Sequence, residues 1–188
     1  MAISAHGPFF RRAVPPDRAA HLAEIERRRG VLATARESGD AAAAAEAAGE
    51  VGWLLFWIEG SEGEAAALME EALAGARSRG DRGAEIAWLL GLGTAVQYLG
   101  ERERTVALFE EGLALCDATG MREQEHYLWH HLGRCLVEMG RIAEARDAFE
   151  RALVIRETMP NPRFAENTRA ALADVAEISR RPEADRRP

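Results

Sequence analysis

Apolar residues recur at every third or fourth position along most of the chain, and glycines interrupt them at regular places. The clearest apolar series run through residues 89–99 and 145–153. Residues at this spacing lie on the same side of a helix, so each series predicts a helix with one apolar face. The glycines fall about every 20 residues: Gly60, Gly100 and Gly140 are spaced 40 apart, and Gly39, Gly80 and Gly120 lie between them.

The glycine spacing predicts eight helices joined by short turns. We expect them near residues 17–38, 41–59, 61–79, 82–99, 101–119, 122–139, 141–158 and 162–180. Glycine supplies the left-handed backbone conformation that ends a helix. Asp40 and Asp81 each follow a glycine directly and can cap the next helix, while residues 61–64 have the form of a capping box. Asn161 with Pro162 can start the last helix.

The segments around the 40-residue spacing share a set of small and large apolar residues. In the third copy these are Trp129, Leu132, Gly133, Leu136, Gly140, Ala145, Phe149 and Ala152. The second copy has, at the same places, Leu89, Leu92, Gly93, Val96, Gly100, Thr105, Phe109 and Gly112. With Leu136 in place of a tyrosine, the third set resembles the consensus of tetratricopeptide (TPR) repeats. The resemblance covers residues 41–159 and implies antiparallel helix pairs that stack on one another.

The first copy keeps most of this pattern but is shifted in its first helix. The matching positions hold Phe56, Gly60, Ala65, Met69 and Ala72. Its small residue, Gly52, lies one position early, and Trp53 occupies the expected place. A one-residue insertion in the first helix would explain the shift. The facing of residues 50–54 stays open on this reasoning.

The repeat period of 40 residues exceeds the usual 34 of TPR proteins and implies longer helices. It resembles the long-helix TPR arrays of large bacterial signal-transduction ATPases and transcriptional activators. The resemblance implies an all-α fold, a TPR-type α-solenoid of three repeats with an N-terminal helix and a C-terminal capping helix. We expect this single repeat domain over residues 17–180, a disordered or docked segment at 1–16, and a disordered tail at 181–188. The rival interpretation is another array of helical hairpins or a plain helix bundle.

TPR proteins usually bind along a concave groove lined by the first helix of each repeat. Carrying the groove-facing offsets over to this sequence gives Leu54, Trp57, Leu90, Thr94, Gln97, Tyr98, Tyr127, His130, Arg134 and Glu138. The set has an apolar, aromatic floor and polar groups at one end, which suits a peptide with an apolar anchor and one acidic or polar group for Arg134. Alternatively, Arg134 and Glu138 merely pair with each other, four residues apart on one helix.

Two histidines are weaker candidates, as metal ligands. His126 and His130 are four residues apart and therefore share one helix face, as a pair of metal ligands would. Such a pair needs a third ligand, which Glu123 or a neighbouring helix could supply. The simpler interpretation, which we favour, is that both are polar residues of the surface or groove, and we expect no cofactor.

Charge and motifs narrow the function classes. Residues 41–160 hold 11 arginines and 21 acidic residues, and this acidic balance argues against non-specific nucleic-acid binding. No stretch approaches the ~20 apolar residues of a membrane-spanning helix, and the first residues do not resemble a signal peptide. Cys116 and Cys135 fall within predicted helices and fit buried thiols in a reducing compartment. We therefore expect a cytoplasmic protein with no membrane partner.

The leading hypothesis is a non-enzymatic scaffold that binds a protein or peptide in its groove, in a regulatory role. No phosphate-binding loop, nucleophile elbow or zinc-protease motif is present. One alternative is a small-molecule binder or enzyme that uses the groove as a pocket, with His130 and Glu138 as an acid–base pair. Another is a homo-oligomeric structural or assembly factor, which could form a homodimer through an open end of the array or through the tryptophan-rich first repeat.

Overall fold

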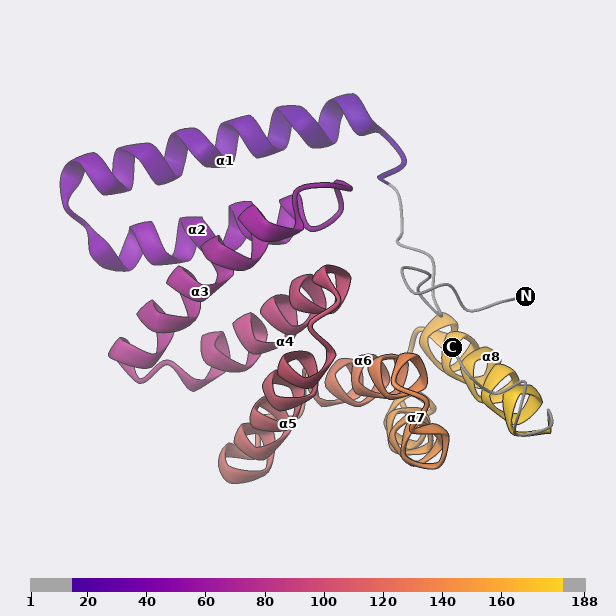
Figure 1. The fold of residues 1–188 in the computed structure, drawn as a ribbon. Coiled ribbons are helices and arrows are strands. Elements are labelled where there is room, and N and C mark those ends of the chain that lie inside the picture. Colours follow the sequence, from indigo (N-terminus) through magenta and orange to yellow (C-terminus); the bar gives the residue numbers. More distant parts are fainter. Residues whose placement is uncertain (1–14, 181–188) are drawn as a thin grey trace. The chain divides into compact units, whose positions relative to one another are not determined.

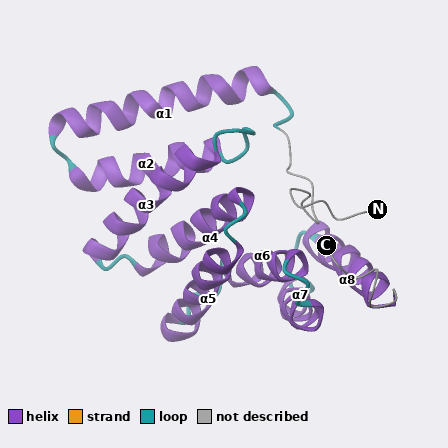
Figure 2. Cartoon of the chain, viewed as in Figure 1, coloured by secondary structure: helices purple, strands orange, loops and turns teal. Residues whose placement is uncertain are grey.

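The computed structural model describes residues 15–180, and these residues fold into helices and turns with no strand among them (Figures 1 and 2). Residues 1–14 and 181–188, which include Phe9, Phe10 and most of both predicted terminal segments, lie outside the described residues. The helices are α1 (Arg18–Ser38), α2 (Ala41–Leu55), α3 (Glu62–Arg79), α4 (Arg82–Leu99), α5 (Arg102–Thr119), α6 (Glu125–Glu138), α7 (Ile142–Arg156) and α8 (Pro162–Arg180).

The described part of the protein divides into two compact units, residues 15–101 and residues 102–180. In the N-terminal unit, α1 packs on α2, α2 on α3 and α3 on α4. In the C-terminal unit, α5 packs on α6, α6 on α7 and α7 on α8. Within each unit, helices adjacent in sequence are therefore adjacent in space, as stacked hairpins require. The single repeat domain over 17–180 stays a prediction.

The predicted turn chemistry is largely confirmed. All six punctuating glycines have positive φ, as a left-handed helix end requires. The Asp40 carboxylate accepts hydrogen bonds from the amides of residues 42 and 43, and Asp81 accepts one from Ala84 N at 3.0 Å. Asn161 Oδ1 accepts a hydrogen bond from Arg163 N, and α8 begins at Pro162 as predicted. These caps satisfy amides that a helix start would leave unpaired.

The capping box at residues 61–64 does not form. Ser61 lies at the N-cap of α3, but its side chain makes no capping hydrogen bond, and its backbone has ψ 7°. A capping residue needs an extended backbone to turn its oxygen toward the first helical amides. The Glu64 carboxylate instead pairs with Arg29 of α1 at 2.7 Å. The Ser61 amide, which the Glu64 side chain would accept from in a capping box, donates to the Ile58 carbonyl at 3.1 Å.

Two helices are shorter than predicted at their C-terminal ends, and one starts later. α2 ends at Leu55 instead of 59, and α7 ends at Arg156 instead of 158, where Pro160 disfavours further helix. α6 begins at Glu125 instead of 122. Met121 follows Gly120 at the place where Asp40 and Asp81 cap the other helices, and methionine has no acceptor that could start α6 earlier.

The register of the first repeat is now explained. Twelve residues separate the cap Asp40 from Gly52, the same separation as between Asp81 and Gly93. The extra residue therefore lies after Gly52, where residues 56–60 form turns instead of helix. A Cβ on Gly52 would meet Ala65 O and Met69 Cγ at 2.9 Å, so Gly52 makes the close approach between α2 and α3. Counted from the caps, Trp53 corresponds to Thr94.

The apolar faces predicted for the third repeat form the core of the C-terminal unit. Leu132, Phe149 and Ala152 are buried, and Trp129 is half-buried under Arg151, whose guanidinium lies 4.7 Å from the ring centroid. A Cβ on Gly133 would meet the Phe149 ring at 2.9 Å, so glycine is what lets α6 and α7 approach. The inner face of α8 is buried through Ala171, Val175 and Ile178, and the charged residues of this helix are exposed.

Candidate functional site

The N-terminal unit holds six of the residues predicted to bind a partner. Leu90, Thr94 and Gln97 of α4 are buried, and the Thr94 hydroxyl donates to the Leu90 carbonyl at 2.8 Å. The other three, Leu54, Trp57 and Tyr98, are half-buried and keep part of their surface accessible. The partner-binding role of all six stays a prediction.

An aromatic cluster, Trp53, Phe56 and Trp57, lies at the C-terminal end of α2. Trp53 and Phe56 meet edge to face with ring centroids 5.2 Å apart, and Phe56 and Trp57 lie 5.0 Å apart. Phe56 is buried, whereas Trp53 is 39% exposed. A Cβ on Gly91 would meet the Trp53 ring at 3.2 Å, so one side of Trp53 lies against α4. The cluster thus presents an anchored but solvent-exposed tryptophan, a residue type that typically dominates binding surfaces.

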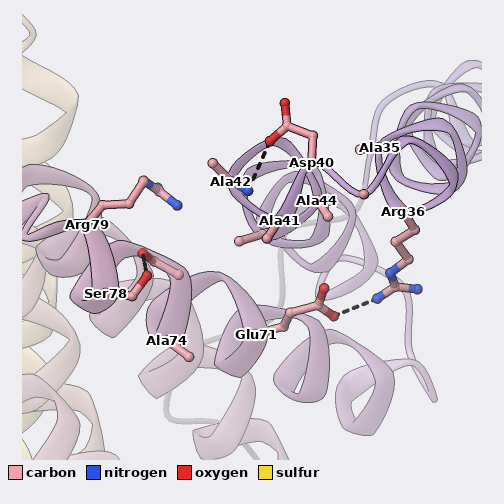
Figure 3. Close-up of a pocket in the computed structure, with 13 residues that line it drawn as sticks. Ala35, Arg36, Asp40, Ala41, Ala42, Ala44, Glu71, Ala74, Ser78 and Arg79 are labelled. Carbon is pink, nitrogen blue, oxygen red and sulfur yellow. Dashed lines mark hydrogen bonds and ion pairs between the residues drawn. The ribbon is translucent and has the colours of Figure 1, made fainter.

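The N-terminal unit also has an open cleft of about 650 Å³ walled by α1, α2 and α3 (Figure 3). Most of its lining consists of alanines and glycines. An ion pair between Arg36 Nη2 and Glu71 Oε2, 2.6 Å apart, spans it from α1 to α3 (Figure 3). The small apolar side chains shape the cleft, and Asp40, Ser78 and Arg79 add polar groups to its lining.

The first repeat lacks an ion pair that the later ones have. Arg82 and Glu85 pair at 2.5 Å in the first turn of α4, and Arg122 and Glu125 pair at 2.8 Å around the start of α6. Counted from the caps, the first repeat has Ala41 and Ala44 at those two positions. Both alanines line the cleft.

The C-terminal unit holds the other four predicted residues, all on α6. Tyr127 is half-buried, while His130, Arg134 and Glu138 are buried. Glu138 Oε2 pairs with Arg102 Nε of α5 at 3.3 Å, and Arg134 Nη1 lies 3.5 Å from His131 Nδ1. Two of the four, Tyr127 and His130, belong to a buried cluster with residues of α7 and α8.

Arg156 is the centre of that cluster. The residue is 3% exposed, and its Nε donates to His126 Nδ1 at 3.1 Å. Its Nη1 donates to Thr168 Oγ1 at 2.8 Å and to the Phe164 carbonyl at 3.3 Å. The guanidinium lies 5.7 Å from the ring centroid of Tyr127 and 5.5 Å from that of Phe164, within reach of cation–π attraction.

The hydrogen bonds define the protonation of both histidines. His126 Nδ1 accepts from Arg156, so this imidazole is neutral with its proton on Nε2. The Thr168 hydroxyl donates to the Phe164 carbonyl at 3.1 Å and accepts from Arg156, so His130 Nδ1, 3.2 Å away, donates to its remaining lone pair. Every hydrogen-bonding position of the Thr168 hydroxyl is therefore used.

Burial lowers the pKa values of His126, His130 and Arg156. Desolvation, with a smaller contribution from Arg156, lowers the pKa of His126 from 6.5 to about 4. The pKa of His130 falls well below its ordinary value for the same two leading reasons. Desolvation lowers the pKa of Arg156 to about 10, which still leaves the guanidinium charged at neutral pH.

The metal-site hypothesis gains no third ligand. Among residues 15–180 no three histidine, cysteine or carboxylate groups converge as a metal would need. His126 Nδ1 is occupied by Arg156, and His130 Nδ1 by Thr168. Cys116 and Cys135 are buried free thiols, and desolvation raises their pKa values to about 11 and about 12, so both stay protonated.

Sequence reasoning missed Arg156, Thr168 and the exposure of Trp53. Arg156 follows Ala152 by four residues and so continues the apolar stripe of α7, where an arginine is out of place. That break in the pattern was the available signal. Trp53 could have been found by counting from the helix cap instead of between turn glycines.

Comparison with known proteins bears on the fold alone. No protein-family model matches the sequence, and no curated protein does. Among solved structures, a Podosopora anserina protein provisionally assigned as a kinesin light chain, with nearly identical TPR-like repeats, superposes with a TM-score of 0.69 at 18% identity. The match covers 85% of this protein and 78% of that one. The protein therefore has the all-helical, TPR-type repeat fold that the sequence predicts.

Proposed function

We propose that this protein is a non-enzymatic scaffold that binds a segment of another protein through the first helices of its hairpins. The exposed Trp53 near the end of α2, which packs on Phe56 and against Gly91 of α4, is the observation that carries the proposal. A tryptophan fixed by its neighbours loses little conformational entropy when it buries its remaining surface against a partner. The cluster therefore favours an apolar side group of the partner as its ligand.

The charge of the repeats supports a protein as the partner class. Residues 41–160 carry ten more acidic than basic residues, which repels the phosphates of a nucleic acid. No helix among the described residues has the length and apolarity to cross a membrane. We infer a cytoplasmic setting, and we retain the half-buried residues of the predicted set, Leu54, Trp57, Tyr98 and Tyr127, as partner contacts.

The buried members of the predicted set interact within the fold and are not proposed as partner contacts. His130 lies 3.2 Å from Thr168 Oγ1, and Glu138 pairs with Arg102 at 3.3 Å, so both side chains are engaged within their own unit. The acid–base pair considered from the sequence has little support, because burial holds His130 neutral and a catalytic base must take up a proton.

Affinity capture with purified variants tests the proposal. Wild-type protein and Trp53→Ala are used as bait in lysate of the native host, and recovered proteins are identified by mass spectrometry. A partner that binds wild type is then purified, and its Kd is measured with both proteins. Loss of a buried tryptophan contact predicts a Kd at least tenfold higher, corresponding to roughly 1.4 kcal/mol or more.

Val31→Ala is the matched control, because Val31 is 52% exposed on α1 of the same unit and lies outside the aromatic cluster. It is expected to leave the Kd unchanged. Equal affinity of wild type and Trp53→Ala for every recovered partner would overturn the proposal. Recovery of the bait protein itself alone, with a concentration-dependent dimer, would favour the homo-oligomeric alternative.

A further inference from the structure

Arg156 carries a buried positive charge that no described acidic residue balances. Its partners are a neutral imidazole, a hydroxyl and a backbone carbonyl, and its second terminal nitrogen, Nη2, donates to none of the residues 15–180. Burial of an arginine without a counter-charge costs several kcal/mol, which hydrogen bonds to neutral groups offset only in part.

Two buried carboxylates among the described residues are each paired with arginine. Glu85 is 3% exposed and pairs with Arg77 and Arg82, at 3.1 and 2.5 Å. Glu125 pairs with Arg122 at 2.8 Å. Each of these carboxylates therefore has an arginine as its counter-charge. Arg156 has no carboxylate partner among the described residues and lies beside two aromatic rings instead.

Packing alone does not require an arginine at position 156. The inner stripe of α7 runs through Ala145, Phe149 and Ala152, so a methionine or leucine would continue it at no cost in charge burial. Replacement of buried charges by apolar residues of similar volume is often neutral or stabilising. The charge at position 156 therefore fits a binding role better than a packing role.

We propose that Arg156 binds a carboxylate of the partner segment, with the faces of Tyr127 and Phe164 receiving the apolar group next to it. This inference rests on the proposed function and names one chemical feature of its ligand. Arginine has a fixed fork of donors that matches a carboxylate, and the half-buried rings of Tyr127 and Phe164 have their centroids 5.7 and 5.5 Å from its guanidinium. The rings meet edge to face with centroids 5.5 Å apart, and the proposal requires one of them to move so that the ligand reaches Nη2.

N-Acetylphenylalanine and its neutral amide are the matched probes. The amide keeps the ring and the acetyl group but lacks the negative charge. Binding is followed by NMR through the Nε–H resonance of Arg156, which is observable because the group is buried and hydrogen-bonded to His126. We expect the carboxylate to shift this resonance in a saturable way and to bind at least tenfold more tightly than the amide.

Substituted proteins separate a specific site from general attraction. Arg156→Met should weaken binding of N-acetylphenylalanine at least tenfold. Arg151→Met is the control. Arg151 of α7 also lies over an aromatic ring, that of Trp129, but it is exposed, so this substitution should leave binding unchanged. If Arg156→Met does not fold, the saturable shift in the wild-type protein still decides the question.

A second probe, N-acetyl-aspartyl-phenylalaninamide, distinguishes an aspartate carboxylate from the terminal carboxylate of a peptide. Tighter binding of either acidic probe supports the proposal and identifies the source. Equal binding of acid and amide, no shift at Arg156, or full binding by Arg156→Met would overturn it. If Trp53 is needed for partner capture but Arg156 binds no carboxylate, the scaffold proposal holds and only the Arg156 site is rejected. If Arg156 binds the carboxylate but Trp53 is not needed for partner capture, the scaffold proposal is rejected.

Discussion

Arg156 and Thr168 show how single residues connect the last repeat to α8. One hydroxyl, Thr168 Oγ1, accepts from Arg156 of α7 and from His130 of α6 while it donates within α8. Removal of that hydroxyl leaves a buried guanidinium N–H and an imidazole N–H without their acceptor. Such unsatisfied groups cost more than the hydrogen bonds that they replace.

Thr168→Val should therefore lower the free energy of unfolding by about 1–3 kcal/mol, because it keeps the shape and deletes the acceptor. Chemical denaturation of both proteins measures the change. Thr158→Val is the control: Thr158 is exposed and its hydroxyl only bonds the Ile155 carbonyl, so a change below about 0.5 kcal/mol is expected. Equal effects at the two sites would contradict the cluster.

The lowered pKa of His126 predicts the direction of the pH dependence. In the unfolded state this imidazole takes up a proton near pH 6.5, and in the folded state only near pH 4. Between these values the unfolded state binds more protons, so stability falls as the pH drops and levels off below about 4. The full effect is on the order of 3 kcal/mol, from about 1.4 kcal/mol per pKa unit.

Denaturant unfolding of wild type and His126→Gln between pH 7 and pH 4 checks this expectation. Glutamine keeps an oxygen that can accept from Arg156 but takes up no proton. Wild type should lose more stability across the range than the variant does, although His130 and His131, whose pKa values are also lowered, leave the variant a residual slope. Parallel curves for the two proteins would refute the assignment of neutral His126.

At the scale of the helix, the sequence predicted most starts and ends because glycine and aspartate act locally. The errors have tertiary or contextual causes. Ser61 does not cap because its backbone is not extended, and Glu64 pairs with Arg29 of another helix, which no local pattern reveals. The late start of α6, in contrast, could have been predicted, because Met121 cannot cap.

Substitution by alanine should lower stability at a helix cap that forms, and it should have little effect at one that does not form. Asp81→Ala removes an acceptor of the Ala84 amide and should destabilise the protein by about 1 kcal/mol. Ser61→Ala removes a hydroxyl without a capping bond and should cost less than about 0.3 kcal/mol. Thermal denaturation of the two variants compares them directly, and a larger loss for Ser61→Ala would be inconsistent with the observed caps.

The close approach of α6 and α7 depends on Gly133. An added Cβ would overlap the Phe149 ring, so Gly133→Ala should destabilise by about 1–3 kcal/mol although alanine favours helix. Gly30→Ala in α1 is the control, because nothing lies within 4 Å of its added Cβ, and it should stabilise by up to about 1 kcal/mol. Opposite signs at the two glycines, measured by urea unfolding, are the expected result.

At the scale of the whole molecule, repetition made the fold predictable. Small residues at the position of Gly133 and large apolar residues at the position of Phe149 recur in each repeat, and this recurrence indicates stacked hairpins whatever the partner is. The match to a solved structure supports this fold. The binding surfaces were less predictable, because they depend on departures from the repeat. Trp53 and Arg156 each break the pattern at one position, and only neighbouring helices determine whether such a residue is exposed or buried.

Site-specific photo-crosslinking tests the central claim most directly. A photoreactive phenylalanine analogue is placed at position 53 or, as control, at position 31, and the protein is irradiated in its native host. The scaffold proposal predicts that one defined protein is crosslinked at position 53 and not at position 31. Absence of a crosslinked partner at position 53, or the same partners at both positions, would contradict the claim that Trp53 contacts a bound protein.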